Sequence, residues 1–157
     1  MDVEIHKLLI DYRTREWCLL PYPDHPKGCP NYDKKKDICP PSAPYVEDFI
    51  DLQKSVWFVY TTFDLGEHVA RMLVKHESWS DRQARCVLYW QKGVVNRLQA
   101  LAKQFCQEHP GTRYTLCPEA MGVLVTATGL LLGLPIQVKP TTLVHKIALV
   151  GYNKDGE

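Results

Sequence analysis

The sequence predicts an α/β fold in which a small, mostly parallel sheet is flanked by helices and preceded by an irregular segment rich in cysteine and proline. Two observations support this prediction. Apolar, β-branched stretches alternate along the chain with stretches of helical period, which is typical of strands and helices packed in layers. Seven of the eleven prolines lie between Pro21 and Pro44, where proline prevents an unbroken helix or strand.

The predicted elements follow one another with clear local signals. Residues 55–63 are rich in β-branched and aromatic side chains and predict a buried strand. Asp64 followed by Glu67 indicates a capping box, so an amphipathic helix begins there. The remaining predicted elements are a long helix from Ser80, where Gln83 repeats the capping signal, to a stop at 109–111, a strand at 112–117, a helix from Pro118 to Gly133, and a last strand at 143–152.

Size, charge and terminal pattern narrow the class of protein. The 157 residues predict a single domain, 1–157, with a Cys/Pro-rich metal-binding loop at 15–45 and an α/β body at 55–152. The net charge is only +1, so no overall field attracts nucleic acid or anionic lipid. No apolar run reaches the ~20 residues of a membrane span, and the N-terminus lacks a secretory pattern. We therefore expect a cytoplasmic protein without a membrane partner, whose cysteines are thiols, ligands or catalytic groups.

Cys18, Cys29 and Cys39 lie in the proline-rich segment and predict a metal centre. Their spacing is neither that of a zinc knuckle nor that of a compact ferredoxin run. Cys29 and Cys39 each precede a proline, and a loop of about two dozen residues needs something to tie it down in a compact domain. The alternative interpretation is that these are three small hydrophobic residues in a proline-rich flap.

Cys117 is expected to be the fourth ligand. It ends a predicted strand and occupies the N-cap position of the helix that begins at Pro118, where the helix dipole favours a thiolate. The alternative is a buried cysteine at the end of a strand. His25 is a candidate ligand or proton donor in the loop, although a loop histidine is more often solvated. Cys106 is expected to lie a strand's length, about 17 Å, from Cys117, and so outside the site.

Polar side chains recur at three- and four-residue spacing along the predicted long helix, opposite its apolar face. Arg82, Arg85 and Lys92 in this stripe form a candidate phosphate-binding patch, with Tyr89 available for stacking on a base. The same stripe is typical of any solvated helix surface. An RNA-binding accessory role therefore remains an alternative for residues 82–103.

The stretches "GCPNY", "CPPSAPYVEDF" and "CPEAMGVLVTATGLLLGLPI" together resemble an uncharacterised bacterial and archaeal family described as predicted metal-binding proteins. The resemblance implies that Cys18, Cys29 and Cys39 are early ligands. It also places Glu119, a candidate ligand or neighbour of the ligands, in a late Glu-Ala-Met-Gly motif. The second set of closely spaced cysteines in that family is missing here, so one centre is expected.

Four thiolates suit either zinc or a 4Fe-4S cluster, and long irregular spacing with flanking prolines favours the cluster. With Cys117 bound, the centre would be closed, which suits electron transfer or a structural role. Without it, one iron would stay open for Lewis-acid or sulfur-transfer chemistry. A non-catalytic zinc protein is the alternative, and the sequence does not define a small-molecule or protein partner.

Overall fold

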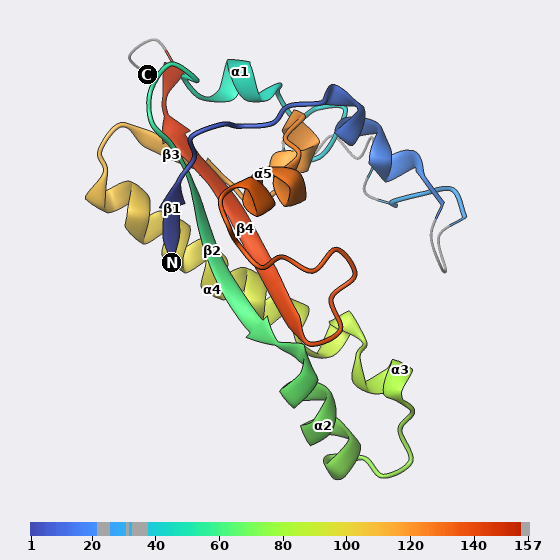
Figure 1. The fold of residues 1–157 in the computed structure, drawn as a ribbon. Coiled ribbons are helices and arrows are strands. Elements are labelled where there is room, and N and C mark those ends of the chain that lie inside the picture. Colours follow the sequence, from blue (N-terminus) through green and yellow to red (C-terminus); the bar gives the residue numbers. More distant parts are fainter. Residues whose placement is uncertain (22–25, 31, 33–37, 155–157) are drawn as a thin grey trace.

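A computed structural model describes residues 1–21, 26–30, 32 and 38–154 of the chain. Its centre is a four-stranded sheet in the order β1-β2-β4-β3 (Figure 1). The strands are β1 (Asp2–Glu4), β2 (Val56–Asp64), β3 (Thr112–Thr115) and β4 (Leu143–Tyr152). Every neighbouring pair is antiparallel, so the prediction of a mostly parallel sheet is wrong.

The path of the chain explains this difference. β2 and β3 each run antiparallel to β4, so they run in the same direction, and helix α4 (Gln91–Glu108) carries the chain back between them. Such a crossover gives a parallel pair when its two strands are neighbours. Here the C-terminal strand β4 lies between them, as in a split β-α-β arrangement, and every ladder is therefore antiparallel.

Local signals placed several boundaries correctly. Helix α2 (Leu65–Lys75) begins as predicted, because the Asp64 carboxylate accepts a hydrogen bond from the Glu67 backbone N–H at 2.8 Å. The capping box of Ser80 and Gln83 is also present, with both reciprocal hydrogen bonds made. The last predicted strand is confirmed as β4.

The long helix predicted from Ser80 is interrupted, which corrects that expectation. A short helix α3 (Asp81–Ala84) and a 3-10 turn η2 (Val87–Tyr89) precede α4. Between η2 and α4, Trp90 leaves the helical conformation with φ −142°. Its indole N–H donates to the Arg85 carbonyl at 3.1 Å, and its ring stacks on Phe63 with 5.0 Å between centroids. The helix is therefore interrupted at Trp90, because its large ring packs against Phe63.

The helix predicted from Pro118 to Gly133 is also divided in two. It consists of the 3-10 helix η3 (Pro118–Met121) and helix α5 (Val125–Leu131). Gly122 separates them with φ +100°, and a Cβ at this glycine would collide with the ring of Tyr12. Only glycine combines this backbone conformation with such a close approach.

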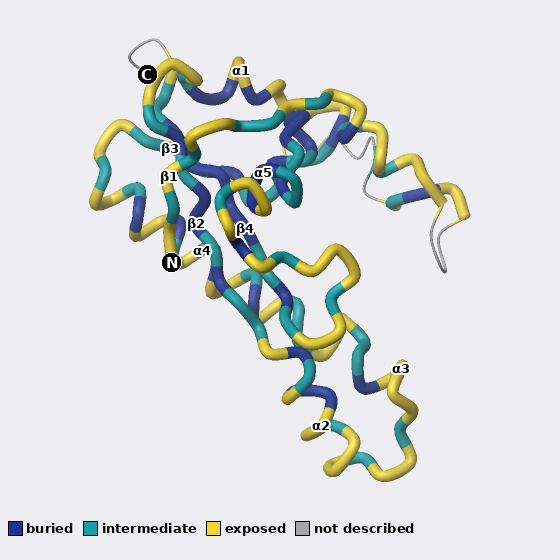
Figure 2. Tube along the Cα trace, viewed as in Figure 1, coloured by how far each residue is buried: buried dark blue, intermediate teal, exposed yellow. Residues whose placement is uncertain are grey.

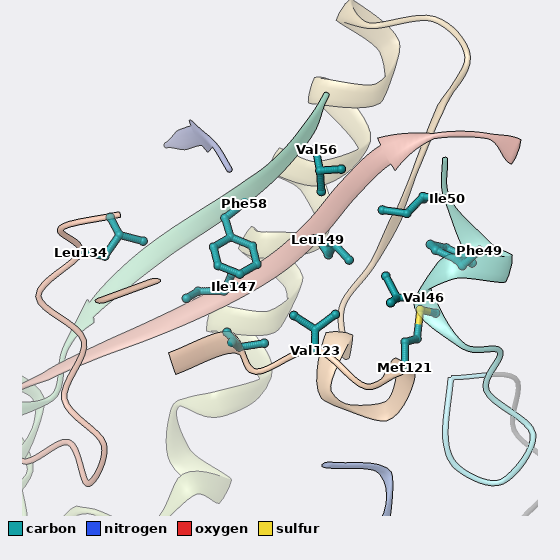
Figure 3. Close-up of a cluster of buried hydrophobic side chains, with 11 residues drawn as sticks. Val46, Phe49, Ile50, Val56, Phe58, Met121, Val123, Leu134, Ile147 and Leu149 are labelled. Atoms are coloured by element: carbon teal, nitrogen blue, oxygen red, sulfur yellow. The ribbon is translucent and has the colours of Figure 1, made fainter. Parts of the chain in front are cut away.

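Helices cover both faces of the sheet. α4 packs on one face, whereas α1 (Val46–Phe49), η3 and α5 pack on the other (Figure 1). Burial is greatest along β2 and β4 (Figure 2), where Phe58 and Leu149 are fully buried. Figure 3 shows the main core, which lies between these strands and the helices α1, η3 and α5. Its buried members are Val46, Phe49, Ile50, Val56, Phe58, Met121, Val123, Val125, Leu134, Ile147 and Leu149.

The N-terminal part of the chain contains two elements that the sequence did not indicate, the strand β1 and a 3-10 helix. Residues Tyr12–Leu19 form a 3-10 helix, η1, although residues 15–41 show no helical period. Asp11 caps it by accepting a hydrogen bond from the Arg13 backbone N–H at 3.0 Å. Cys18 lies in the last turn of this helix, so its position is fixed by regular structure. In the described part of the chain, no helix has both the length and the apolarity needed to cross a membrane.

Candidate functional site

The four candidate thiol ligands come from separate parts of the chain. These parts meet beside the face of the sheet that α1, η3 and α5 cover. Cys18 lies in the last turn of η1, Cys29 and Cys39 follow in the proline-rich part, and Cys117 is the N-cap of η3. We call the described residues between 12 and 44 the thiol segment. It docks on η3 through the buried Thr14, whose hydroxyl donates to the Glu119 carbonyl at 2.6 Å.

Arg15 joins three of these parts. One guanidinium nitrogen, Nη1, donates to the carbonyl of Ala43 at 2.6 Å and to that of Ala120 at 3.0 Å. Nη2 donates to the carbonyl of Pro41 at 3.1 Å. The guanidinium also lies over the Tyr45 ring, 4.3 Å from its centroid. Because Arg15 lies one helical turn before Cys18, these bonds hold the parts carrying Cys18, Cys39 and Cys117 against one another.

A tight backbone contact joins Cys29 to Cys18. The Cys29 backbone N–H donates to the Cys18 carbonyl at 2.6 Å. Gly28, immediately before it, has φ +89°, and a Cβ there would collide with the same Cys18 carbonyl. Glycine is therefore required for the two cysteine-bearing backbones to approach this closely.

The thiols influence one another electrostatically. Burial raises the pKa of the Cys18 thiol, and the neighbouring thiols of Cys29 and Cys39 and the carboxyl of Glu119 raise it further. Burial, and next the charge of Glu119, raise the pKa of Cys117 to about 11, with smaller contributions from Cys39 and Cys18. These influences agree with the hydrogen bonds of Thr14, Arg15 and the Cys29 backbone, which bring the parts that carry the four thiols and Glu119 into one region of the molecule.

The pKa of Cys117 corrects the expectation that a helix N-terminus stabilises its thiolate. η3 has only four residues, so its dipole is small, and Cys117 makes no side-chain capping hydrogen bond. Burial and the adjacent carboxyl of Glu119 both favour the neutral thiol. A cation bound among the thiols would reverse this balance, because it would favour each thiolate directly.

The donor set suits a metal, although it is not arranged around a single ion. Among the described residues, no group of three or more Cys, His, Asp or Glu side chains is arranged to hold a metal ion. All six cysteines are free thiols of intermediate burial. Four of them gather with Glu119, and thiolates are the ligands that zinc and iron–sulfur clusters take. The predicted ligand His25 lies outside the described residues.

The two remaining cysteines lie elsewhere. Cys106 belongs to α4 and packs with Val59, Phe105 and Val150, on the opposite face of the sheet from η1 and η3. Cys86 precedes η2 and donates its backbone N–H to the Gln83 carbonyl at 3.2 Å. Neither contributes to the electrostatic interactions of Cys18 or Cys117.

The candidate phosphate-binding patch does not form one helical stripe. Arg82 belongs to α3, Arg85 follows it, and Lys92 lies in α4 beyond the break at Trp90. Arg85 pairs with Asp81 at 2.7 Å and donates to the Thr141 carbonyl at 2.7 Å. The helical periodicity that predicted the stripe is therefore interrupted. The stripe no longer supports the RNA-binding alternative.

A pocket of about 710 Å³ opens beside the thiols, and Cys117 and Glu119 form part of its wall. Burial raises the pKa of Glu119, whereas a backbone hydrogen bond and the charge of Lys146 lower it. Lys146 comes from β4 and lines the same pocket. The site therefore has two adjoining parts, which are the group of thiols and an open pocket that meets it at Cys117.

Sequence reasoning missed Arg15 and Lys146. The partners of Arg15 are backbone carbonyls, which leave no pattern in a sequence. Lys146 did leave a signal, because His145 and Lys146 interrupt the otherwise apolar strand at 143–152. Comparison with known proteins adds no relative, since no family model, curated protein or solved structure shows a significant match to this chain.

Proposed function

We propose that this protein binds one metal centre through the thiols of Cys18, Cys29, Cys39 and Cys117, and that the centre is a 4Fe-4S cluster with a redox or sulfur-transfer role. The observation that carries the proposal is the gathering of four half-buried thiols from four parts of the chain, which hydrogen bonds from Thr14, Arg15 and the Cys29 backbone hold together. The motif resemblance to predicted metal-binding proteins supports the same proposal. A cytoplasmic location, which we propose with it, would keep these thiols reduced and able to bind metal.

The contacts around the thiols support a bound group over incidental packing. Arg15 and Gly28 hold cysteine-bearing backbones together without bringing apolar side chains into a core. Large apolar side chains of the thiol segment, such as Trp17, Leu19 and Ile38, remain exposed. Because a coordinated metal contributes folding energy directly, it would stabilise a region that buries little apolar surface.

A cluster is favoured over zinc because the cysteines are far apart and irregularly spaced in the sequence, and because Cys29 and Cys39 each precede a proline. The ligands of one zinc ion all lie about 2.3 Å from the same atom, whereas the thiolates of a four-iron cluster bind different irons and stand farther apart. When bound, the cluster would supply electron transfer, or Lewis-acid and sulfur-accepting chemistry at an open iron if Cys117 is not a ligand. Glu119 would then lie beside that position as a neighbouring carboxyl.

The test is to purify the protein without oxygen and to quantify iron, sulfide and zinc per chain. We expect about four iron and four sulfide per chain, with broad absorption near about 400 nm. Cys18→Ser, Cys29→Ser and Cys39→Ser should each lose most of the metal. Cys86→Ser and Cys106→Ser are matched controls, because these thiols are also half-buried but lie outside the site.

Three results would decide differently. About one zinc per chain without iron, lost in the same three variants, would establish the zinc alternative. A chain that holds no metal after reconstitution would contradict the proposal. Metal loss in Cys106→Ser, with the fold intact, would show that the ligand set is wrong.

A further inference from the structure

The pocket beside Cys117 lies where the sheet loses a strand. β3 pairs with β4 only between Leu149 and Tyr152, whereas β4 begins at Leu143. The first half of β4 therefore has no strand on this side among the described residues. The pocket, of about 710 Å³, occupies this edge and falls within the range of ~300–1,000 Å³ that is common for small-molecule sites.

Two basic side chains line the pocket. Lys146 is of intermediate burial, and among the residues that the structure describes, its ammonium makes no ion pair within 4.0 Å. Arg85 also lines the pocket and is held in place by Asp81 and the Thr141 carbonyl. Glu119 supplies the only carboxyl in the described lining. The Lys146 ammonium is thus positioned to bind an added negative group.

The other walls are largely apolar. Trp90, Val125, Ile136 and Val138 line the pocket along with further aliphatic side chains. His145 is the remaining titratable group of the lining apart from Cys117, and its Nδ1 is buried without a hydrogen-bond partner among the described residues. An apolar wall with a few convergent polar groups is typical of a site for a small organic molecule.

We infer that this pocket binds a small organic anion, whose apolar part lies along Trp90 and Val138 and whose charged group pairs with Lys146, beside Cys117. The inference rests on the proposed function only for what the anion would meet at Cys117, since binding itself needs the pocket and not the metal. It deepens that proposal by naming the ligand class that would reach the centre.

The test uses two dyes with the same apolar body. 1-Anilinonaphthalene-8-sulfonate carries a negative charge, whereas N-phenyl-1-naphthylamine lacks the sulfonate. We expect the anionic dye to bind roughly tenfold more tightly than the neutral dye to the folded protein, as an ion pair inside a pocket allows. Lys146→Met should remove this preference, and Lys146→Arg should retain it. Lys103→Met, an exposed lysine of α4, is the matched control.

A second measurement does not depend on any variant. Raising the salt concentration from 0.05 to 0.5 M should weaken binding of the anionic dye several-fold and leave the neutral dye unchanged, because only the ion pair is screened. Equal affinities for the two dyes, a preference that persists in Lys146→Met, or no saturable binding of either dye would overturn the inference.

Measuring iron in the same samples separates the two proposals. A Lys146-dependent preference in protein that never takes up metal would leave the pocket established and remove the metal centre. Full metal content in wild type and in Lys146→Met, without any charge preference, would leave the centre and remove the anion site.

Discussion

The sheet and the thiol segment are held together by different means. β2 and β4 form a continuous ladder from Val56 to Asp64, and both strands bury apolar side chains on their two faces. The thiol segment instead depends on hydrogen bonds from Arg15, Thr14 and the Cys29 backbone. Apolar burial therefore stabilises the sheet by itself. The thiol segment, which carries three of the thiols, has little core and would gain most from a bound metal.

The largest expected effect falls on the sheet. Phe58 is fully buried in the main core (Figure 3), so Phe58→Ala should lower the free energy of unfolding by about 3–5 kcal/mol. Urea unfolding of the metal-free protein measures this change. Leu131→Ala is the control, because this side chain is exposed and should change stability by less than about 1 kcal/mol. Similar losses in the two variants would contradict the assignment of the core.

The second effect depends on pH and belongs to the thiol site. The folded-state pKa of Cys117 is about 11, above its ordinary value of 9.0, so the folded protein holds this proton more tightly. That contribution to stability is fully present below pH 9 and is lost as the pH rises through 11. The loss is at most about 3 kcal/mol, since each pKa unit corresponds to ~1.4 kcal/mol.

Unfolding of metal-free protein at pH 8 and pH 11 measures this loss, and Cys117→Ser removes the contribution of other groups by difference. Wild type should lose more stability than Cys117→Ser over this interval. Equal losses would show that the thiol is not buried beside Glu119. Metal-loaded protein should instead lose stability as the pH falls, because protons compete with the metal for the thiolates.

The smallest of these effects concerns Arg15. Replacing it by Met should lower the free energy of unfolding by about 2 kcal/mol, because charged hydrogen bonds to two other parts of the chain, at 41–43 and at Ala120, are lost. Amide hydrogen exchange should speed up at residues 38–44 and leave β2 and β4 unchanged. Arg13→Met is the control, since the exposed Arg13 pairs only locally with Asp11. Uniform acceleration across the sheet would contradict a local role.

Local chemistry made parts of this fold predictable. The capping residues Asp64 and Ser80 marked true helix starts, and residues 143–152 formed the expected strand. The sheet topology was not predictable in this way, because no local signal shows that β4 lies between β2 and β3. The helix break at Trp90 likewise depends on Phe63, which lies far away in the sequence.

The candidate site shows the same division. The proline-rich context of Cys18, Cys29 and Cys39 predicted a shared site, and hydrogen bonds bring their segments together beside η3. That these thiols bind one metal centre stays a prediction. Burial and Glu119 raise the pKa of the Cys117 thiol. The sequence indicated only that a helix starts after this residue. Arg15 acts through backbone carbonyls, so its role became visible only once the segments were folded together.

Mapping of thiol reactivity tests the central claim, which is that four of the six thiols share one metal centre. All six are half-buried, but the raised pKa of Cys117, about 11, makes this thiol slow to react at pH 8 even without metal. Metal-loaded and metal-free proteins are labelled with N-ethylmaleimide at pH 8, and labelling is read at each cysteine by mass spectrometry. Metal should strongly protect Cys18, Cys29 and Cys39, should further slow the already slow labelling of Cys117, and should leave Cys86 and Cys106 unchanged. Labelling that is the same in both states, or protection of Cys86 or Cys106, would contradict a metal centre shared by these four thiols.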